Sequence, residues 1–259
     1  MTDPLADGLL ALATSVAADA AALIRGRMAS PRLAAGTKTS PTDMVTETDR
    51  AAEALIVGAL LAARPGDGIL AEEGSERASL TGVRWVIDPL DGTTNFLYGV
   101  PAFAVRVAAE RDGEVLAGVV HDVPHGQAYT ASRGGGAFCD GVPLHVTARA
   151  ELATALVGTG FGYVATRRAE QAAIVARVLP LVRDIRRIGA AALDLCAVAA
   201  GRLDGYYERG VQPWDVAAGA LIVREAGGLA GWEPGQDPPT FVAAGPALHP
   251  LLAAAVRLP

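Results

Sequence analysis

Apolar positions near the amino terminus recur at helical spacing. The chain from about Asp3 to Met28 is rich in Ala and Leu at this spacing, which predicts an amphipathic helix. A second helical rhythm follows Thr48, which we interpret as its capping residue, and ends before Pro65-Gly66. Between these two helices, Ala29 to Asp43 carries two prolines and several small polar residues, so we expect a mobile loop there.

In the middle of the chain the apolar residues form short runs of strand length instead of a helical repeat. Apolar runs of strand length alternate with Gly and Asp turns, and Arg111 to Glu114 has the composition of a tight hairpin turn. The predicted strands are residues 68–71, 84–87, 103–109, 115–120 and 128–131. This region is therefore expected to form a mostly antiparallel sheet.

After Leu152 the pattern alternates between strands and helices. We expect strands at 155–157, 184–188, 205–208 and 241–243, and helices at 167–179, 190–200, 216–226 and from Pro246. A helix pair, a sheet and an alternating segment indicate a layered α+β fold. We expect residues 1–150 and 151–259 to form two halves of one compact unit, with a soft boundary near Thr147 to Leu152.

Composition narrows the class of protein. The 259 residues are 51% hydrophobic and 19% charged, which is typical of a globular protein. The net charge of -6 argues against nucleic acid as the main ligand. The longest apolar runs are shorter than a membrane span needs, and the chain does not open with the pattern of a signal sequence. We therefore expect a cytoplasmic protein with no membrane partner. Cys139 and Cys196 are expected to be reduced.

The segment from Trp85 to Phe96 carries the most informative chemistry. An apolar strand ends in Asp88, Pro89 fixes the turn, and Asp91 follows three residues later, so both carboxylates can converge with the Leu90 carbonyl between them. Two carboxylates held this close repel each other unless a cation lies between them. Oxygen ligands of this kind favour a hard divalent cation, Mg²⁺ first.

The next three residues suit an anion. Gly92, Thr93 and Thr94 are small and offer backbone N–H groups where a helix or tight turn begins. Asp-Pro and Asp-Gly are also ordinary turn dipeptides, but the whole string is far more specific than either alone. Metal-binding acids beside an anion site point to phosphoryl chemistry.

Two further acidic positions have alternative interpretations. Glu72-Glu73 ends a short apolar strand, where a pair of acids is most often a solvated loop edge. Asp215 precedes a helix that is apolar on nearly all faces and is therefore expected to be buried. Asp215 is either the N-cap of that helix or a metal ligand, and both interpretations stay open.

These segments together resemble the inositol monophosphatase family of Mg²⁺-dependent, lithium-sensitive phosphatases. Residues 158–163 and 186–194 are most similar to its bacterial, SuhB-type branch. The resemblance covers nearly the whole chain in order and includes residues 43–49, 68–74, 85–96, 206–208, 214–215 and 225–228.

The resemblance implies a layered αβαβα sandwich, usually a homodimer, that hydrolyses a phosphomonoester without a covalent intermediate. Glu72, Asp88 and the Leu90 carbonyl would hold a first Mg²⁺, and Asp88, Asp91 and Asp215 a second. A third, weaker ion would lie near Glu72, which gives two to three metal ions per chain, with Mn²⁺ as a substitute.

It also implies roles in catalysis. Thr93, hydrogen-bonded to Asp49, would orient the attacking water, and Glu72 would accept its proton. Substrate contacts would come from residues around the phosphate and the polyol, namely Lys38, Asp91, Gly92, Thr93, Thr94, Gly189, Ala190, Ala191, Glu208 and Asp215. Ala190 stands where relatives carry Thr or Ser, and Glu208 is alternatively a surface strand residue.

The expected substrate is a small phosphorylated polyol, myo-inositol 1-phosphate first. Histidinol phosphate, fructose 1,6-bisphosphate, a nucleotide 3'-phosphate and NADP(H) are rivals. A second anionic group on the substrate would need a second cationic pocket, for which Arg186 and Arg187 are candidates. A regulatory role in binding RNA polymerase is a further alternative, since some bacterial proteins that resemble this one bind the transcription machinery.

Overall fold

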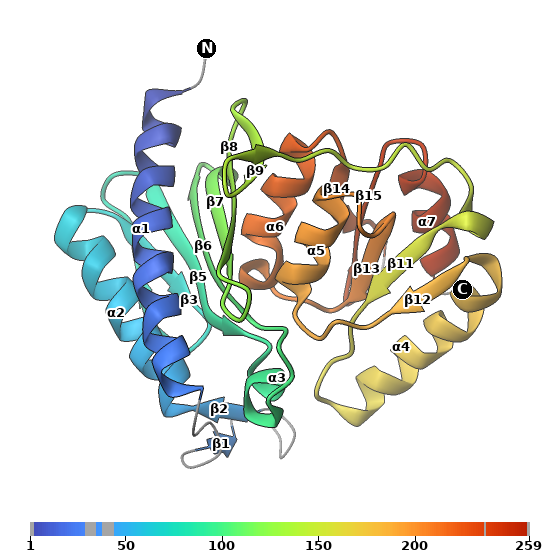
Figure 1. The fold of residues 1–259 in the computed structure, drawn as a ribbon, viewed down its shortest axis with the longest axis horizontal. Helices are drawn as coiled ribbons and strands as arrows, with labels where there is room; N and C mark the ends of the chain where they lie inside the picture. Colours follow the sequence, from blue (N-terminus) through green and yellow to red (C-terminus); the bar gives the residue numbers. More distant parts are fainter. Residues whose placement is uncertain (1–2, 29–34, 38–43, 236, 258–259) are drawn as a thin grey trace.

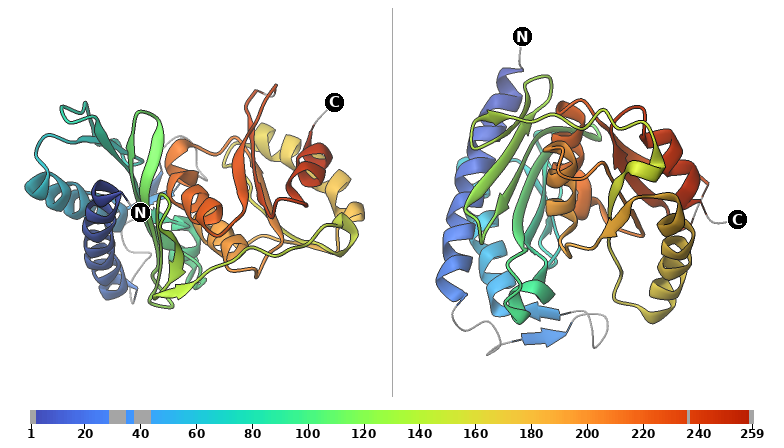
Figure 2. Two further views of the ribbon diagram at one scale, coloured as in Figure 1. Left: turned by 90° about the horizontal axis from the view of Figure 1, so that it is seen from above. Right: turned by 45° about the vertical axis from the view of Figure 1, so that its right-hand side comes forward.

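Two β-sheets alternate with three layers of helices (Figure 1). The structure, a computed structural model, describes residues 3–28, 35–37, 44–235 and 237–257. From one side to the other the layers are helices α1 and α2, a large sheet, helices α5 and α6, a smaller sheet, and helices α4 and α7 (Figures 1 and 2). The layered α+β fold expected from the sequence is confirmed.

The first sheet is built by residues up to Pro143. Its order is β10-β9-β8-β7-β6-β5-β3-β4, and neighbouring strands are antiparallel except for β3 and β5. At the β6–β7 turn Asp112 and Gly113 have φ values of 56° and 79°, which confirms the expected tight hairpin. The strands are β3 (Gly68–Ala71), β4 (Glu76–Arg77), β5 (Val83–Asp91), β6 (Ala104–Arg111), β7 (Glu114–Asp122), β8 (Gln127–Ser132), β9 (Gly136–Cys139) and β10 (Val142–Pro143).

Helices α1 (Pro4–Arg27) and α2 (Glu47–Ala63) cover the outer face of this sheet. The expected start of α2 is two residues late: Thr46, not Thr48, is its N-cap, and Asp49 closes a capping box with it. A two-stranded ribbon of β1 (Ala35–Thr37) and β2 (Met44–Thr46) precedes α2. Part of the expected loop is therefore β-strand, and residues 29–34 and 38–43 of it lie outside the described residues.

Helix α1 corrects one expectation. By length and composition it is apolar enough to cross a membrane, although the sequence was expected to hold no segment of that kind. In the fold its buried side packs against β6, β7 and α2, as expected of a core helix. A membrane-spanning helix and a long core helix can have the same length and the same apolar composition, so these two properties alone do not distinguish them.

The second sheet has the order β12-β11-β13-β15-β14. Strand β11 is parallel to both of its neighbours, whereas β15 is antiparallel to β13 and β14. The strands are β11 (Leu156–Thr159), β12 (Asp184–Arg186), β13 (Gly205–Arg209), β14 (Leu229–Glu233) and β15 (Thr240–Ala244). The outer helices are α4 (Ala165–Val178) and α7 (His249–Val256), with short 3₁₀ turns at Leu152–Thr154 and Leu179–Leu181.

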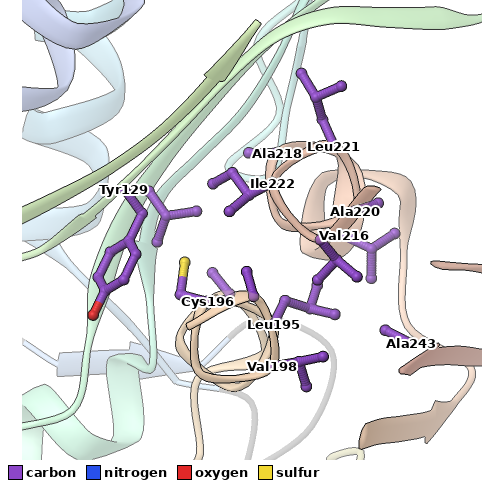
Figure 3. Close-up of a cluster of buried hydrophobic side chains, with 14 of the residues drawn as sticks. Tyr129, Leu195, Cys196, Val198, Val216, Ala218, Ala220, Leu221, Ile222 and Ala243 are labelled. Atoms are coloured by element: carbon purple, nitrogen blue, oxygen red, sulfur yellow. The ribbon is translucent and has the colours of Figure 1, made fainter. Parts of the chain in front are cut away.

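Helices α5 (Ala191–Ala199) and α6 (Pro213–Glu225) fill the space between the sheets. Figure 3 shows Leu195 of α5 in the space between the two helices, Cys196 of α5 and Ile222 of α6 on the side of Tyr129 of β8, and Val198 of α5 on the side of Ala243 of β15. Both cysteines are free and buried, as expected. The expected burial of α6 is also confirmed, since seven of its residues, Val216 and the run from Ala218 to Val223, are buried.

Several short strands were not expected. Strands β4, β9 and β10 are two to four residues long, and β14 carries exposed Leu229 and Trp232. A strand of two to four residues is too short to show the alternation of apolar and polar residues that marks a strand in the sequence. Pairing with a neighbouring strand sets the conformation of these strands: β4 pairs with β3, β9 with β8 and β10, and β14 with β15.

We expect Gly118→Ala to destabilise the protein by about 1–3 kcal/mol. A Cβ at Gly118 of β7 would lie 3.0 Å from the Cα of Ala218, so α6 and the first sheet would have to separate. Urea denaturation measures the effect. The matched control is Gly58→Ala in α2, where an added Cβ meets nothing within 4 Å and should stabilise the helix by about 0.5–1 kcal/mol. Equal stability of the Gly118 variant and the parent would contradict the close packing.

Candidate active site

A cavity of about 540 Å³ opens where the ends of both sheets meet the inner helices. Its walls come from the loop after β3, the end of β5, the loop between β11 and α4, strand β13 and the first residues of α5 and α6. The sequence-predicted residues that line it are Glu72, Asp88, Leu90, Asp91, Gly92, Thr93, Gly189, Ala190, Ala191, Glu208 and Asp215. Residues remote in the sequence are thus brought together by the layers.

A bulge in β5 places two acids on one side of the sheet. Asp88 pairs with Arg106 of β6 and Asp91 with Ala104, so three steps along β5 match two along β6. Residues three apart in a regular strand point to opposite faces, and the extra residue brings Asp91 to the face of Asp88. Both carboxylates therefore line the cavity.

Backbone N–H groups hold the aspartates in position. Asp88 Oδ1 accepts from the Leu90 N–H at 2.8 Å, and Asp91 Oδ2 accepts from the Ala192 N–H, in the first turn of α5, at 2.8 Å. Burial raises the pKa of Asp91 to about 7; Arg106 opposes this shift and Asp88 adds to it. The Asp91 carboxylate consequently depends on nearby positive charge.

Asp215 lies in the first turn of α6 but is not its N-cap. That position belongs to Gln212, whose N–H donates to Asp215 Oδ2 at 2.6 Å, so Asp215 completes a capping box. Its other oxygen faces Arg106. Burial raises the pKa of Asp215, and the guanidinium of Arg106 lowers it.

The loop that carries Glu72 is fixed from two sides. The Glu72 N–H donates to the Ile87 carbonyl of β5 at 3.1 Å. The carboxylate of Glu53 on α2 accepts from the N–H groups of Glu73 and Ser75, at 2.8 and 3.1 Å. Glu72 is half-buried at the cavity wall, so it is not merely a solvated loop edge.

Sequence reasoning missed Arg106, the buried cation of this site. Its guanidinium lies beside Asp88, 3.2 Å from Asp215 Oδ1 and 3.7 Å from Asp91 Oδ2. Burial opposes the charge, but the three carboxylates together hold the pKa of Arg106 above its ordinary value. The sequence does contain an indication, because Arg106 alternates with Ala104 and Ala108 on one face of an otherwise apolar strand.

Two overlapping sets of oxygen donors share Asp88. Carboxylates of Glu72 and Asp88 and the Leu90 carbonyl line the cavity and are oxygen ligands of the kind that Mg²⁺ takes. The second set, the carboxylates of Asp88, Asp91 and Asp215, faces the Arg106 guanidinium. In the part of the chain that the structure describes, no three His, Cys, Asp or Glu side chains are arranged to hold a metal ion as they stand.

Thr93 and Asp49 are joined directly. The Thr93 hydroxyl donates to Asp49 Oδ1 at 2.9 Å and lies 3.1 Å from the Leu90 carbonyl. The other oxygen of Asp49 accepts from the hydroxyl and the N–H of Thr46, the latter at 2.8 Å. Burial raises the pKa of Asp49, and its hydrogen bonds to Thr46 and Thr93 oppose the shift. Asp49 lies behind Thr93 rather than in the cavity wall.

The turn into α3 (Thr93–Tyr98) requires glycine. Gly92 has φ 91°, and a Cβ there would lie 2.8 Å from the Ala102 carbonyl oxygen. The Asn95 amide donates to the carbonyls of Ala102 and Ile188, which ties α3 to the loop before Gly189. Thr93 and Thr94 fall in the first turn of α3, whose N–H groups have no helical acceptor.

The opposite wall carries a second group of acids. The Tyr206 hydroxyl donates to Glu208 Oε2 at 2.5 Å, and a Cβ at Gly160 would collide with that carboxylate. Burial raises the pKa of Glu208 to about 7, against the Tyr206 hydrogen bond, and Asp215 and Asp91 add to the shift. Asp194 of α5 is buried, and its Oδ1 has no hydrogen-bond partner among the residues that the structure describes. Burial holds the pKa of Asp194 well above its ordinary value.

Arginines line the same cavity beside these acids. Arg187 belongs to its wall, whereas Arg186 pairs with Asp184 outside it. Arg167 and Arg209 also line the cavity, and both pair with Glu170. Sequence reasoning named Arg186 and Arg187 as candidates for a second cationic pocket; of the two, Arg187 lines the cavity.

Two predicted substrate contacts are not in this wall. Thr94 does not line the cavity with a side chain, although its neighbour Thr93 does. Lys38 lies outside the described residues.

The layered fold and the acidic cavity define a phosphatase of the α+β class. The family model described as "Inositol monophosphatase family" matches residues 6–257. The chain belongs to the inositol monophosphatase family, and the expectation of a phosphatase enzyme is confirmed.

Sequence relatives agree with the assignment to this family. The chain is 51% identical to "Inositol-1-monophosphatase SuhB" of Mycobacterium tuberculosis over 237 residues, which cover 85% of this chain and 82% of that protein. It is 40% identical to "Nus factor SuhB" of Salmonella typhimurium, over 85% of this chain and 84% of that protein.

Solved structures show the same fold. The extragenic suppressor protein suhB of Bartonella henselae has a TM-score of 0.90 at 35% identity, covering 96% of this chain and 98% of that chain. SuhB of Mycobacterium tuberculosis has a TM-score of 0.84 at 46% identity, covering 98% and 97%. SaIMPase-II, solved with bound inositol monophosphate, has a TM-score of 0.78 at 27% identity, covering 96% and 93%.

We expect Glu208→Gln to change how stability depends on pH. The folded protein keeps a proton on Glu208 between pH 4.5 and about 7, where the unfolded chain has released it, so the parent loses stability as the pH rises through this window. The variant lacks this loss and should gain up to about 3 kcal/mol relative to the parent by pH 8. Urea denaturation at pH 4.5 and pH 8 measures the difference. Glu114→Gln at an exposed position is the control, and parallel profiles for parent and Glu208→Gln would contradict the raised pKa.

Proposed function

We propose that this phosphatase hydrolyses the phosphate monoester of a small polyol, with myo-inositol 1-phosphate as its leading substrate and Mg²⁺ as its metal. The observation that carries the proposal is the single cavity in which Glu72, Asp88 and the Leu90 carbonyl face the Gly92–Thr93 turn. Oxygen donors for a divalent cation and backbone N–H groups for a phosphate lie side by side there. Names of relatives support the substrate, since several are called inositol-1-monophosphatase.

The metal site of the proposal is the set of Glu72, Asp88 and the Leu90 carbonyl. A divalent cation held there would offset the charge of the phosphate and make a nearby water more acidic. The backbone around this set is already fixed, because Glu53 holds the Glu72 loop and Leu90 N–H holds Asp88.

Thr93 would orient the attacking water. Because its hydroxyl hydrogen is directed at Asp49 or the Leu90 carbonyl, its oxygen lone pairs can accept a hydrogen bond from that water. Glu72 would then accept the proton as the water attacks phosphorus. The P–O bond to the polyol would break in the same step, and the departing alkoxide oxygen would take up a proton from solvent. The buried Asp49 carboxylate sets the direction of the hydroxyl and needs no contact with substrate.

The polyol would lie against the opposite wall. Glu208 Oε1 can accept hydrogen bonds from ring hydroxyls, while Oε2 is engaged by Tyr206. Gly189, Ala190 and Ala191 leave room because their side chains are small or absent. A neutral, hydroxyl-rich leaving group suits a wall that combines buried acids with small residues.

A substrate with a second anionic group is the alternative that one observation favours. Arg167 and Arg187 line the cavity and are cations of the type that binds phosphate. Arg167 is already 3.7 Å from Glu170, which reduces its charge toward a ligand. We therefore rank fructose 1,6-bisphosphate, NADP(H), a nucleotide 3'-phosphate and histidinol phosphate below inositol 1-phosphate.

The remaining expectations from the family stay proposals. We propose a cytoplasmic homodimer whose activity is inhibited by lithium. Binding to the transcription machinery is a second proposed role, supported by relatives called Nus factor SuhB. It does not compete with catalysis, because a binding role would not need the acids of the cavity.

A panel of phosphate esters tests the substrate. We expect the highest kcat/KM for myo-inositol 1-phosphate, because its single phosphate and neutral ring match a cavity with one phosphate-sized turn. Phosphate release is measured at low Mg²⁺ for this compound and its four rivals. A rival with a higher kcat/KM would replace inositol 1-phosphate as the substrate, and absence of phosphate release from all five compounds would overturn the hydrolase assignment.

Substitutions at Thr93 test the orientation of the water. Thr93→Val keeps the shape of the side chain but loses the hydroxyl, and we expect kcat to fall by about 10²-fold or more. Thr93→Ser retains the hydroxyl and should keep most of the activity. Initial rates at saturating substrate measure both, with Glu76→Gln on exposed β4 as a control expected to match the parent. Equal rates for the Val and Ser variants would remove Thr93 from the mechanism.

A further inference from the structure

Arg106 lies inside the acidic cluster of the site and takes no part in the mechanism proposed above. Two of its nitrogens face three aspartates: Nη2 contacts Asp88 and lies 3.2 Å from Asp215 Oδ1, and Nη1 lies 3.7 Å from Asp91 Oδ2. Nη1 also donates to the main-chain carbonyl of Asp215. One guanidinium therefore joins the end of β5 to the start of α6.

The fold holds this side chain in place. The register of the first sheet sets Arg106 directly opposite Asp88, so both side chains leave the sheet on the face toward α6. Ala104 and Ala108 flank it on that face and leave the space that a long side chain needs. Arg106 is only 2% exposed, and α6 covers it. Removing one partner from such a buried ionic group leaves the other charges uncompensated.

The three aspartates are the same three that the family resemblance assigns to a second divalent cation. Two cations cannot share that space, because a metal ion needs the carboxylate oxygens that now accept from the guanidinium. The Arg106 contacts fall on Asp88, Asp91 and Asp215, whereas Glu72 and the Leu90 carbonyl line the cavity together with Asp88. The two halves of the acidic site therefore differ.

We propose that Arg106 is a built-in cation of this phosphatase, which takes the place of the divalent ion that Asp88, Asp91 and Asp215 would otherwise bind. Divalent metal then binds on the Glu72 side of Asp88. The inference deepens the proposed function and rests on it for the use of metal in catalysis. Arg106 is a positioning residue, since its nitrogens contact carboxylates and a carbonyl rather than the cavity.

A guanidinium is not equivalent to a second metal ion. It brings one positive charge instead of two, and its planar N–H groups fix the carboxylates by direction as well as charge. It offers no open coordination position for a leaving oxygen. The cluster of Glu72, Asp88, Asp91 and Asp215 carries four negative charges when ionised, so it stays acidic around Arg106 and can still attract a divalent ion.

Counting bound Mn²⁺ without substrate tests the proposal. Electron paramagnetic resonance measures Mn²⁺ bound per chain in the parent, in Arg106→Ser and in the control Arg84→Ser. Arg84 is an exposed arginine on neighbouring β5 that pairs with Glu110, so its loss leaves the site intact. We expect Arg106→Ser to bind one more Mn²⁺ per chain than the parent and Arg84→Ser to bind the same number. An unchanged count for Arg106→Ser would overturn the proposal.

Two further variants keep the test decisive if Arg106→Ser fails to fold. We expect Asp91→Asn to leave the Mn²⁺ count unchanged, because Asp91 faces Arg106, and Glu72→Gln to lower it by one. Loss of an ion in Asp91→Asn would overturn the proposal. In a Mn²⁺-soaked crystal of the parent, an anomalous peak between Asp88, Asp91 and Asp215 would do the same. Because no substrate is present, these outcomes do not depend on whether inositol 1-phosphate is hydrolysed.

Discussion

The active site depends on the repulsion between acids that the fold forces together. Asp88, Asp91 and Asp215 come from a bulged strand end and a helix start, and burial raises the pKa of Asp91 and Asp215. They remain useful to a phosphatase only if positive charge compensates them. In this chain Arg106 supplies part of that charge from within the protein. The neighbouring oxygens of Glu72 and Leu90 are then left to attract a metal ion.

The layered architecture explains why so many elements end at one place. The large sheet contributes Asp88 and Asp91, the inner helices contribute Asp215 and the Ala192 N–H, and the small sheet contributes Glu208. Each residue sits at or next to the end of a strand or helix, so its backbone is held by regular hydrogen bonding. A site assembled in this way is rigid without needing contacts from long loops. Direct hydrogen bonds such as Thr93 to Asp49 add the finer alignment.

Much of the fold and of the candidate site was predictable from the sequence, and the failures have identifiable causes. Long periodic segments such as α1 and α6 show their faces in the sequence, and the string around Asp88 concentrates unusual chemistry in a few residues. Strands β9 and β14 were missed because both are short and contain glycine, so pairing with the neighbouring strands β8 and β15, rather than a residue pattern of their own, sets their conformation. The role of Asp215 stayed open between N-cap and metal ligand because either Gln212 or Asp215 fits a capping pattern, and the fold makes Gln212 the N-cap. Arg106 was missed because a single arginine in a strand gives no sign of which charges the opposite strand and a distant helix will bring to it.

The position of α6 has a consequence for how this protein is made. Gly118 lets α6 lie directly against the first sheet, so the inner face of that sheet is covered by a segment that is translated about a hundred residues later. Until the ribosome has released residues up to Glu225, the nascent chain exposes the apolar face of β6, β7 and β8, with the Arg106 charge in its midst. An ionic side chain at that spot makes the waiting surface more soluble and less prone to pair with another chain. The same arginine is then enclosed when α6 docks and brings Asp215 to it.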